Sequence, residues 1–400
     1  MRLQCLPLRV KEQEATSIGA SDSHVIKHGM AEVQVLDLHD ALRRHEDVPS
    51  AMTINQLALK RQAISAPSIT QKFLSEEDFT AAAPMLQNRL FRSVEFGTEF
   101  RNESKENRRI TMAIPSLSPA RSLEVWIADE NVESQPRRGI MLKKCQGLML
   151  QTLYAREDGS RDDLRATALK LYRQFFALLK TYPDQKPLRL WNYIPNIVAK
   201  EESCERYHLF NIGRYEAWQA YGPKDINGQP IYPAATGIGS HGGPVVLEGL
   251  TTSYPVYYLQ NPRQIPAPHY SKKYGVLPPV FSRATLHLPP GGPELFIAGT
   301  ASITGEDATW LNDPAMQARE TLKNIEVLMG SENLSSIGQD GYDFDDLSNV
   351  RVYIKHPEHL PIIRREVESV IDPDAIIYLH DDICRREWLL EIEGVARRDP

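Results

Sequence analysis

The sequence predicts an α+β fold in which one strand–helix–strand–helix–strand unit occurs twice, with the helices on one face of mixed sheets. The same order of apolar strand segments and amphipathic helices appears in the middle of the chain and again in its last part. Both copies close on similar residues, Leu247-Glu-Gly-Leu250 in the first and Ile392-Glu-Gly-Val395 in the second. A pattern repeated in its order and in its closing residues indicates two copies of one structural unit.

The first copy is marked most clearly by its helices. Apolar side chains recur at three- and four-residue steps between residues 161 and 180, which is the period of one helix face. A second helical pattern covers residues 206–220. The strands of this copy are expected at 147–154, 189–195 and 245–250.

The second copy repeats this order after a linker at 261–270, whose prolines exclude a regular helix. Its strands are expected at 295–304, 351–357 and 389–395, and its helices at 314–329 and 360–370. The longer of these helices places Leu322, Ile325 and Met329 on one face. That apolar face is expected to pack on the sheet.

The domain boundaries follow from the repeat. We expect an N-terminal extension at 1–80, a first repeat domain at 81–262 and a second at 263–400. Residues 1–80 show no sustained period, which is typical of a segment that is only partly packed. The stretch 221–243 is rich in Gly and Pro, so we expect a long loop there that borders a site.

The last strand of the second copy carries an unusual acid. Glu391 stands between Leu390 and Ile392 in an otherwise apolar run. Burial disfavours the charged form of a carboxyl, so the pKa of Glu391 should rise toward the range useful for proton transfer. The alternative is a solvated strand face that Glu391 shares with Glu393, since residues two apart point the same way.

The repeat separates these two acids. Aligning the closing residues places Glu248 opposite Glu393 and Val246 opposite Glu391. The first copy therefore builds the same strand without an acid at the position of Glu391, so the fold does not require one there. This favours a functional role for Glu391 and a structural role for Glu393.

Composition limits the kind of partner. The net charge of the 400 residues is -6, which argues against a general nucleic-acid binder and means that an anionic substrate needs a local arginine cluster. Four scattered cysteines indicate reduced thiols in a cytoplasmic protein. No apolar run approaches the roughly 20 residues of a membrane span. Because nucleotide, metal and serine-nucleophile motifs are absent, any chemistry must use acid–base and electrostatic groups.

Several segments carry a resemblance to known families. Residues 295–395 resemble the YjgF/RidA (reactive intermediate deaminase) fold. Six pieces in a fixed order are more specifically similar to the chorismatase family: 189–195, 205–214, 233–239, 261–264, 299–302 and 384–394. The resemblance covers roughly residues 85–400. It implies two YjgF/RidA-like, chorismate-mutase-like units packed together, and a monomer or a trimer.

The resemblance also implies an activity. Chorismatases cleave the enol ether of chorismate, a small dianion, and release pyruvate without a metal or an organic cofactor. Glu391 stands at the family's catalytic glutamate. The branch that makes 3-hydroxybenzoate resembles this chain in pairing a glycine, here Gly299, with a cysteine, here Cys384. Another branch yields the dihydroxycyclohexadiene carboxylate, and a third yields both 3- and 4-hydroxybenzoate.

A further set of residues is expected to bind the substrate. Two carboxylates need cationic partners, and Arg364 matches a substrate arginine of the family. The remaining candidates lie on the equivalent helix of the first copy or beside Gly299: Arg206, Tyr207, Arg214, Thr300 and Ala301. The simpler interpretation is a surface or helix-end salt bridge for each arginine, a strand bulge for Gly299 and a small buried side chain for Cys384.

Two other functions stay open at this point. An imine deaminase would carry a catalytic arginine before the last strand, but the corresponding residues, Ile377-Tyr-Leu-His-Asp381, contain none. A non-catalytic member of the fold would bind a metabolite, with Glu391 merely lining the pocket. The sequence favours a cofactor-independent chorismatase that forms 3-hydroxybenzoate and pyruvate.

Overall fold

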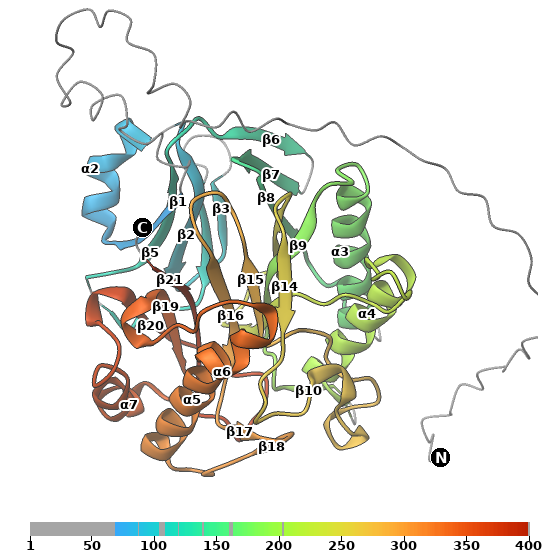
Figure 1. Cartoon of the computed structure of the whole chain (residues 1–400), viewed down its shortest axis with the longest axis vertical. Helices are drawn as coiled ribbons and strands as arrows, with labels where there is room; N and C mark the ends of the chain where they lie inside the picture. The colour runs from blue at the N-terminus through green and yellow to red at the C-terminus, as the bar shows by residue number, and fades with distance from the viewer. Residues whose placement is uncertain are drawn as a thin grey trace, which may run out of the picture. The chain divides into compact units, whose positions relative to one another are not determined.

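The computed structural model describes residues 69–86, 88–103, 109–118, 120–137, 140–159, 163–201 and 204–398. All of them belong to one compact unit, Lys60–Pro400. This unit contains three large sheets, which we call the N-terminal, middle and C-terminal sheets (Figure 1). The fold is α+β, as predicted from the sequence.

The middle sheet contains the first predicted copy. Its strand order is β12-β9-β13-β8-β7-β6. The strands are β6 (Glu133–Arg137), β7 (Ile140–Cys145), β8 (Leu148–Ala155), β9 (Lys186–Pro195), β12 (Ala234–Ser240) and β13 (Val245–Thr252). Helices α3 (Asp163–Leu179) and α4 (Arg206–Tyr221) pack against each other beside this sheet (Figure 1). The stretch 221–243 is not wholly a loop, because β12 lies within it and pairs in parallel with β9.

The C-terminal sheet contains the second predicted copy. Its strand order is β14-β15-β16-β21-β19-β20. The strands are β14 (Val256–Leu259), β15 (Ala284–His287), β16 (Glu294–Thr300), β19 (Leu347–Ile354), β20 (Ile376–His380) and β21 (Leu390–Arg397). The helices are α5 (Pro314–Met329), α6 (Ser331–Leu334) and α7 (Leu360–Val367). Helix α5 has the bounds predicted from its apolar period.

The N-terminal sheet was not predicted. Its strand order is β1-β5-β2-β4-β3. The elements are β1 (Ile69–Leu74), α2 (Glu76–Leu86), β2 (Leu90–Gly97), β3 (Arg101–Glu103), β4 (Arg109–Ala113) and β5 (Leu123–Ala128). Of the expected extension 1–80, residues 1–68 lie outside the described part of the chain, and residues 69–80 form β1 and the start of α2.

All three sheets share one strand arrangement. The orders β1-β5-β2-β4, β8-β13-β9-β12 and β16-β21-β19-β20 each contain two antiparallel pairs followed by one parallel pair. The N-terminal sheet is therefore a third, shortened copy of the repeat. Strand β14, at 256–259, belongs to the C-terminal sheet, so this copy begins before the expected boundary at residue 263.

Shorter elements connect these sheets. Two small hairpins are formed by β10 (Lys200–Glu201) with β11 (Cys204–Glu205) and by β17 (Ile303–Thr304) with β18 (Asp307–Ala308). Single 3-10 turns occur at Ala267–His269, Lys272–Tyr274, Ser335–Ile337, Phe344–Asp346, Pro357–His359 and Pro373–Ala375. The first lies in the linker 261–270 that the sequence excluded from regular helix, and the second follows that linker before β15.

Strand alternation decides which side chains face the helices. On β21, Leu390 and Ile392 belong to the apolar core beneath α5 and α7, while Val395 belongs to a core shared by all three sheets. Since successive side chains point to opposite faces, Glu391 and Glu393 point toward that shared core. Both glutamates are buried there, which excludes the solvated strand face considered from the sequence.

Buried ion pairs join the three copies. Each sheet supplies one arginine and one glutamate: Arg92 and Glu124, Arg189 and Glu248, and Arg351 and Glu393. Arg92 donates to Glu124 at 2.6 Å and to Glu248 at 2.5 Å. Arg351 donates to Glu124 at 2.6 Å and to Glu393 at 3.0 Å. We call these six residues the ion-pair network, and Glu393 has in it the structural role expected from its twin, Glu248.

Candidate active site

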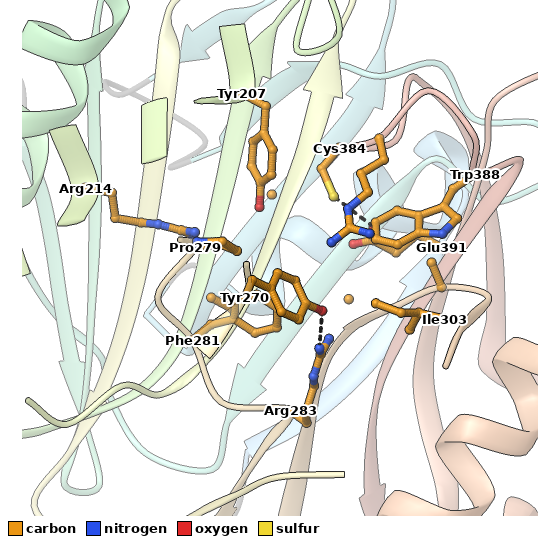
Figure 2. Close-up of a pocket in the computed structure, with 15 residues that line it drawn as sticks. Tyr207, Arg214, Tyr270, Pro279, Phe281, Arg283, Ile303, Cys384, Trp388 and Glu391 are labelled. Atoms are coloured by element: carbon orange, nitrogen blue, oxygen red, sulfur yellow. Dashed lines mark hydrogen bonds between the residues drawn. The ribbon is translucent and has the colours of Figure 1, made fainter. Parts of the chain in front are cut away.

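A pocket lies where the middle sheet meets the C-terminal sheet, and its space of about 490 Å³ includes the part open to solvent. We call it the acid cavity, and Figure 2 shows its lining side chains converging from both sides. The lining residues are Tyr207, Arg214, Ala235, Gly237, Tyr270, Pro279, Phe281, Arg283, Gly299, Ala301, Ile303, Cys384, Arg385, Trp388 and Glu391.

Glu391 is the one carboxylic acid among these lining residues. Its side chain is 3% exposed. Burial raises the pKa of Glu391 to about 8, and the negative charge of nearby Glu393 adds to the effect. Glu393 differs because, although burial raises its pKa, Arg189 and Arg351 bring it below its ordinary value. One strand thus carries a protonated acid and, two residues later, an ionised one.

A bulge in β16 makes room for this acid. The register with β21 shifts between Ile297 and Thr300, so that Ala298 and Gly299 together stand opposite Glu393. A Cβ atom at Gly299 would overlap Oε1 of Glu391. The sequence offered a bulge and a functional glycine as alternatives for this position. The structure confirms the bulge, and the carboxyl of Glu391 fills the space beside the glycine.

Cys384 closes the other side of the carboxyl. Its Sγ lies 4.0 Å from Oε2 of Glu391. Burial, together with the adjacent Glu391, raises the pKa of the Cys384 thiol, so the thiol is not a ready nucleophile. Tyr207 of α4 faces this group across the cavity (Figure 2), and burial likewise raises the pKa of its phenol.

Three arginines give the cavity its positive charge. Arg214 and Arg283 are 1% and 4% exposed, and the Nε of each is buried without a hydrogen-bond partner. Arg214 donates to Asn211 Oδ1 at 2.7 Å, and Arg283 donates to the Tyr270 hydroxyl at 2.5 Å. Neither arginine has an ion pair with a carboxylate among the described residues. Buried guanidinium groups of this kind are suited to an anionic ligand.

The third arginine stands at the mouth of the cavity. The Arg385 guanidinium lies 3.5 Å from the centre of the Tyr274 ring and 4.6 Å from that of Trp388. It also donates to the carbonyl of Glu306 at 2.7 Å. A more open hollow outside shares Tyr207, Pro279 and Arg385 with the acid cavity, so it forms a vestibule to it.

The structure gathers most, but not all, of the residues singled out from the sequence. Those that line the acid cavity are Glu391, Cys384, Gly299, Tyr207, Arg214 and Ala301. Arg364, Arg206 and Thr300 do not line it.

Arg364 lies on the wrong face of the C-terminal sheet to reach Glu391. Its helix, α7, packs on the face opposite the acid cavity, where the Arg364 guanidinium lies 4.9 Å from the centre of the Tyr378 ring. Its Nε is 3.5 Å from Glu368, and the side chain is 41% exposed. The substrate role that the resemblance implied for Arg364 is therefore not supported by its position.

Arg206 and Thr300 have local structural partners instead. Arg206 donates to Glu157 at 2.6 Å and to the carbonyl of Pro195 at 3.0 Å, which is the helix-end salt bridge considered from the sequence. Thr300 of β16 pairs with Ile392 of β21, so its side chain points to the face of the sheet that the helices cover. Its hydroxyl donates to the carbonyl of Ala298 at 2.9 Å.

Sequence reasoning missed Arg283, Arg385, Tyr270 and Trp388. Arg385 and Trp388 lie within the segment 384–394 that resembles the chorismatases, but no period or spacing marked them. Tyr270 lies in the proline-rich linker and Arg283 lies after it. The linker offers no regular pattern to interpret. In the described part of the chain, no group of three or more His, Cys, Asp or Glu is arranged to hold a metal ion. No helix described there is both long and apolar enough to cross a membrane.

Comparison with known proteins supports the family. Residues 124–251 match the family model of "Chorismatase FkbO/Hyg5-like, N-terminal". A Streptomyces hygroscopicus protein named 3-hydroxybenzoate synthase is 35% identical over 302 residues, which are 72% of this chain and 84% of that protein. The chain belongs to the chorismatase family. The resemblance noted in the sequence is thus confirmed.

Two further relatives extend this comparison. A chorismatase of Streptomyces rapamycinicus is 33% identical over 279 residues, covering 68% of this chain and 81% of its own. The crystal structure of a chorismatase superposes with a TM-score of 0.73 at 29% identity. It covers 84% of this chain and 100% of the chorismatase chain.

Proposed function

We propose that this chorismatase-family protein converts chorismate into 3-hydroxybenzoate and pyruvate in the acid cavity. One observation carries the proposal: a buried carboxyl with a pKa of about 8 shares a cavity with three arginines. Proton donation to a dianion needs both features together. The acid must keep its proton near neutral pH, and the cations must offset the charge of the substrate.

The cavity charge suits a substrate with two carboxylates. Arg214 enters from helix α4, Arg283 from the residue before β15 and Arg385 from the loop before β21. Since they approach from different elements, we propose that two of them hold the two carboxylates while the third closes the mouth. Arg385 suits the closing role because it is stacked among Tyr274 and Trp388 beside the vestibule.

Glu391 is proposed to supply the proton that starts the reaction. The carboxyl donates to the terminal methylene carbon of the enol ether, which becomes the methyl group of pyruvate. The positive charge develops at the ether-bearing carbon, beside the newly formed Glu391 carboxylate that stabilises it. The bond between the ring carbon and the ether oxygen then breaks, and its electron pair leaves with pyruvate.

The oxygen of the ring's own hydroxyl is proposed to capture the cationic ring carbon. The oxygen of the neighbouring ring hydroxyl bonds to the vacated carbon, and the proton it loses returns to Glu391. The bond from this oxygen to its original ring carbon then breaks, the carbon that now carries the oxygen loses its proton, and the oxygen takes up a proton. The ring then becomes aromatic, and the two products together contain all the atoms of chorismate. The small wall made by Gly299 and Cys384 supports this branch, as does the 35% identity to a protein named 3-hydroxybenzoate synthase. Capture by water would give the dihydroxycyclohexadiene carboxylate instead.

Incubation of the purified protein with chorismate tests the proposal. We expect pyruvate and 3-hydroxybenzoate in equal molar amounts. A coupled lactate dehydrogenase assay measures the pyruvate, and chromatography with mass detection identifies the 3-hydroxybenzoate. Glu391→Gln serves as the matched control for spontaneous decay of chorismate. Absence of pyruvate above that control would refute the reaction, while pyruvate with another ring product would refute only the branch.

A further inference from the structure

We propose that Thr236 is a positioning residue for the acid, because its hydroxyl holds the glycine bulge open around the Glu391 carboxyl. Thr236 lies on β12 of the middle sheet, whereas Glu391 and Gly299 lie on the C-terminal sheet. The inference rests on the proposed function in one respect, namely that Glu391 is the proton donor. It gives a residue of the middle copy a role in the chemistry proposed for the C-terminal copy.

The Thr236 hydroxyl uses its full hydrogen-bonding capacity. A hydroxyl has one proton to donate and two lone pairs to accept with. Oγ1 accepts from the backbone N–H of Gly299 at 2.9 Å and from Arg189 Nη2 at 2.5 Å. It donates to Oε2 of Glu393. No aliphatic side chain of the same shape makes any of these three bonds.

These bonds meet at the bulge that accommodates the acid. The β16–β21 ladder is interrupted between Ile297 and Thr300, so the Gly299 N–H has no partner strand at this point. Thr236 supplies that partner from the other sheet. A buried N–H without a partner is costly, so the bulge would relax if the hydroxyl were removed. The space that the bulge leaves beside Gly299 is the space that Glu391 Oε1 occupies.

The same hydroxyl fixes the charges nearest the acid. Arg189 and Glu393 are both within hydrogen-bond distance of Thr236 and of each other, at 2.7 Å between Nη2 and Oε2. A change in this pair alters the field at Glu391, because Glu393 disfavours its ionisation and Arg189 favours it. Thr236 therefore sets both the room and the electrostatic surroundings of the carboxyl.

Kinetics of two substitutions separate positioning from bulk packing. Thr236→Val keeps the shape but makes none of the three bonds, so we expect kcat to fall roughly 10- to 100-fold with KM changed far less. Thr236→Ser keeps the hydroxyl and should recover most of that loss. Thr251→Val is the matched control, since Thr251 is equally buried and donates to Gln185 at 2.7 Å on a strand away from the cavity. An unchanged kcat in Thr236→Val would overturn the inference.

A double-mutant cycle with Glu391→Gln gives the decisive readout. If Thr236 acts through the acid, adding Thr236→Val to Glu391→Gln should lower the residual rate no further. A merely structural threonine would give the same fold-loss in both backgrounds, which would also overturn the inference. Thr236→Ala replaces the valine variant in the cycle if the valine variant does not fold.

An activity-independent measurement separates this inference from the proposed function. Carbon NMR of carboxyl-labelled protein, with Glu391→Gln as the subtraction, follows the titration of Glu391 itself. We expect its midpoint to shift in Thr236→Val and to stay near the parent value in Thr236→Ser. An unshifted midpoint in Thr236→Val contradicts the positioning role. Failure to turn over chorismate, with the midpoint shifted as expected, refutes the function alone.

Discussion

The last strand of the C-terminal copy and the last strand of the middle copy place different groups at equivalent positions. On β21 the inner face carries Glu391 and Glu393, and on β13 it carries Val246 and Glu248. Glu248 and Glu393 each have a buried arginine partner. Val246 packs in the shared apolar core, whereas Glu391 fills a cavity without such a partner.

The neighbouring strands explain why only one copy has an acid site. The register of β8 with β13 runs without a shift, and Val246 stands directly opposite Tyr154. A second pocket adjoins this region, but the acid in its lining is Glu248, which Arg92 neutralises at 2.5 Å. Two local differences distinguish the C-terminal copy: a glycine bulge that makes room, and an acid left without its own arginine.

The largest expected effect is the contrast between Glu391→Gln and Glu248→Gln. The first removes a titrating proton but keeps shape, so kcat should fall roughly 10²–10⁴-fold while the fold is retained. The second leaves Arg92 with one buried partner fewer, so it should cost several kcal/mol of stability, about 3–5 by analogy with broken buried pairs. Steady-state kinetics measures the loss of kcat in Glu391→Gln, and denaturant unfolding measures the loss of stability in Glu248→Gln. Near-normal turnover in Glu391→Gln would end the assignment of the acid.

The next effect concerns the arginines. Arg214→Ala or Arg283→Ala removes a charge-assisted bond worth about 1.5–3 kcal/mol, which corresponds to a rise in KM of roughly 10- to 150-fold. Arg364→Ala is the matched control, since it lies on the helix face and is 41% exposed. Its KM should stay within about twofold of the parent. Equal increases at all three positions would mean that the cavity arginines do not bind the carboxylates.

This arginine comparison shows what the sequence could and could not predict. Periodicity predicted α5 to the residue and placed the two main copies, because an apolar face on a helix repeats regularly. Alignment of the repeats singled out Glu391, because an acid replaced an apolar twin. Arg283 had no such mark: it follows a linker whose path depends on contacts far apart in the chain. Arg364 was misplaced because the face on which a helix packs is a tertiary property.

The third copy was missed for a related reason. Its strands are short, and no helix lies between β2 and β4 in the residues described there. Of the two helices that marked each of the other copies, only the first therefore has a counterpart in the described residues of this copy. Only the strand order and its contribution to the ion-pair network, Arg92 and Glu124, identify it. Long-range pairing of this kind leaves no local signal in the sequence.

The third prediction is a pH dependence of activity and stability. The folded-state pKa of Glu391 is about 8, above its ordinary value of 4.5, so between these values the folded state holds a proton that the unfolded chain has lost. Stability then falls as pH rises through this window, by about 1.4 kcal/mol per unit, and is level above it. Glu391→Gln should lack this loss, so unfolding of the two proteins should diverge from pH 5 to pH 8.

Activity should follow the same group. The donor must be protonated, so kcat/KM should decline above about pH 8, approaching tenfold per unit. Asp381, whose pKa burial also raises to about 8, is present in both proteins and cancels in the stability comparison. A kcat/KM that is flat from pH 7 to 10 would contradict the role of Glu391 as the acid.

The smallest expected effect is on the choice of product, and it sharpens the comparison between the copies most. Gly299→Ala adds an atom where Glu391 Oε1 lies, so it should lower total turnover as well as change the product. Cys384→Val leaves that space intact and enlarges only the wall 4.0 Å from Oε2. We therefore expect Cys384→Val to change pyruvate release little and to shift the ring product a few-fold from 3-hydroxybenzoate toward the diene acid, because the ring loses the pose for internal attack. Chromatography of both acids, measured against total pyruvate, checks this, and an unchanged ratio would show that Cys384 only fills space.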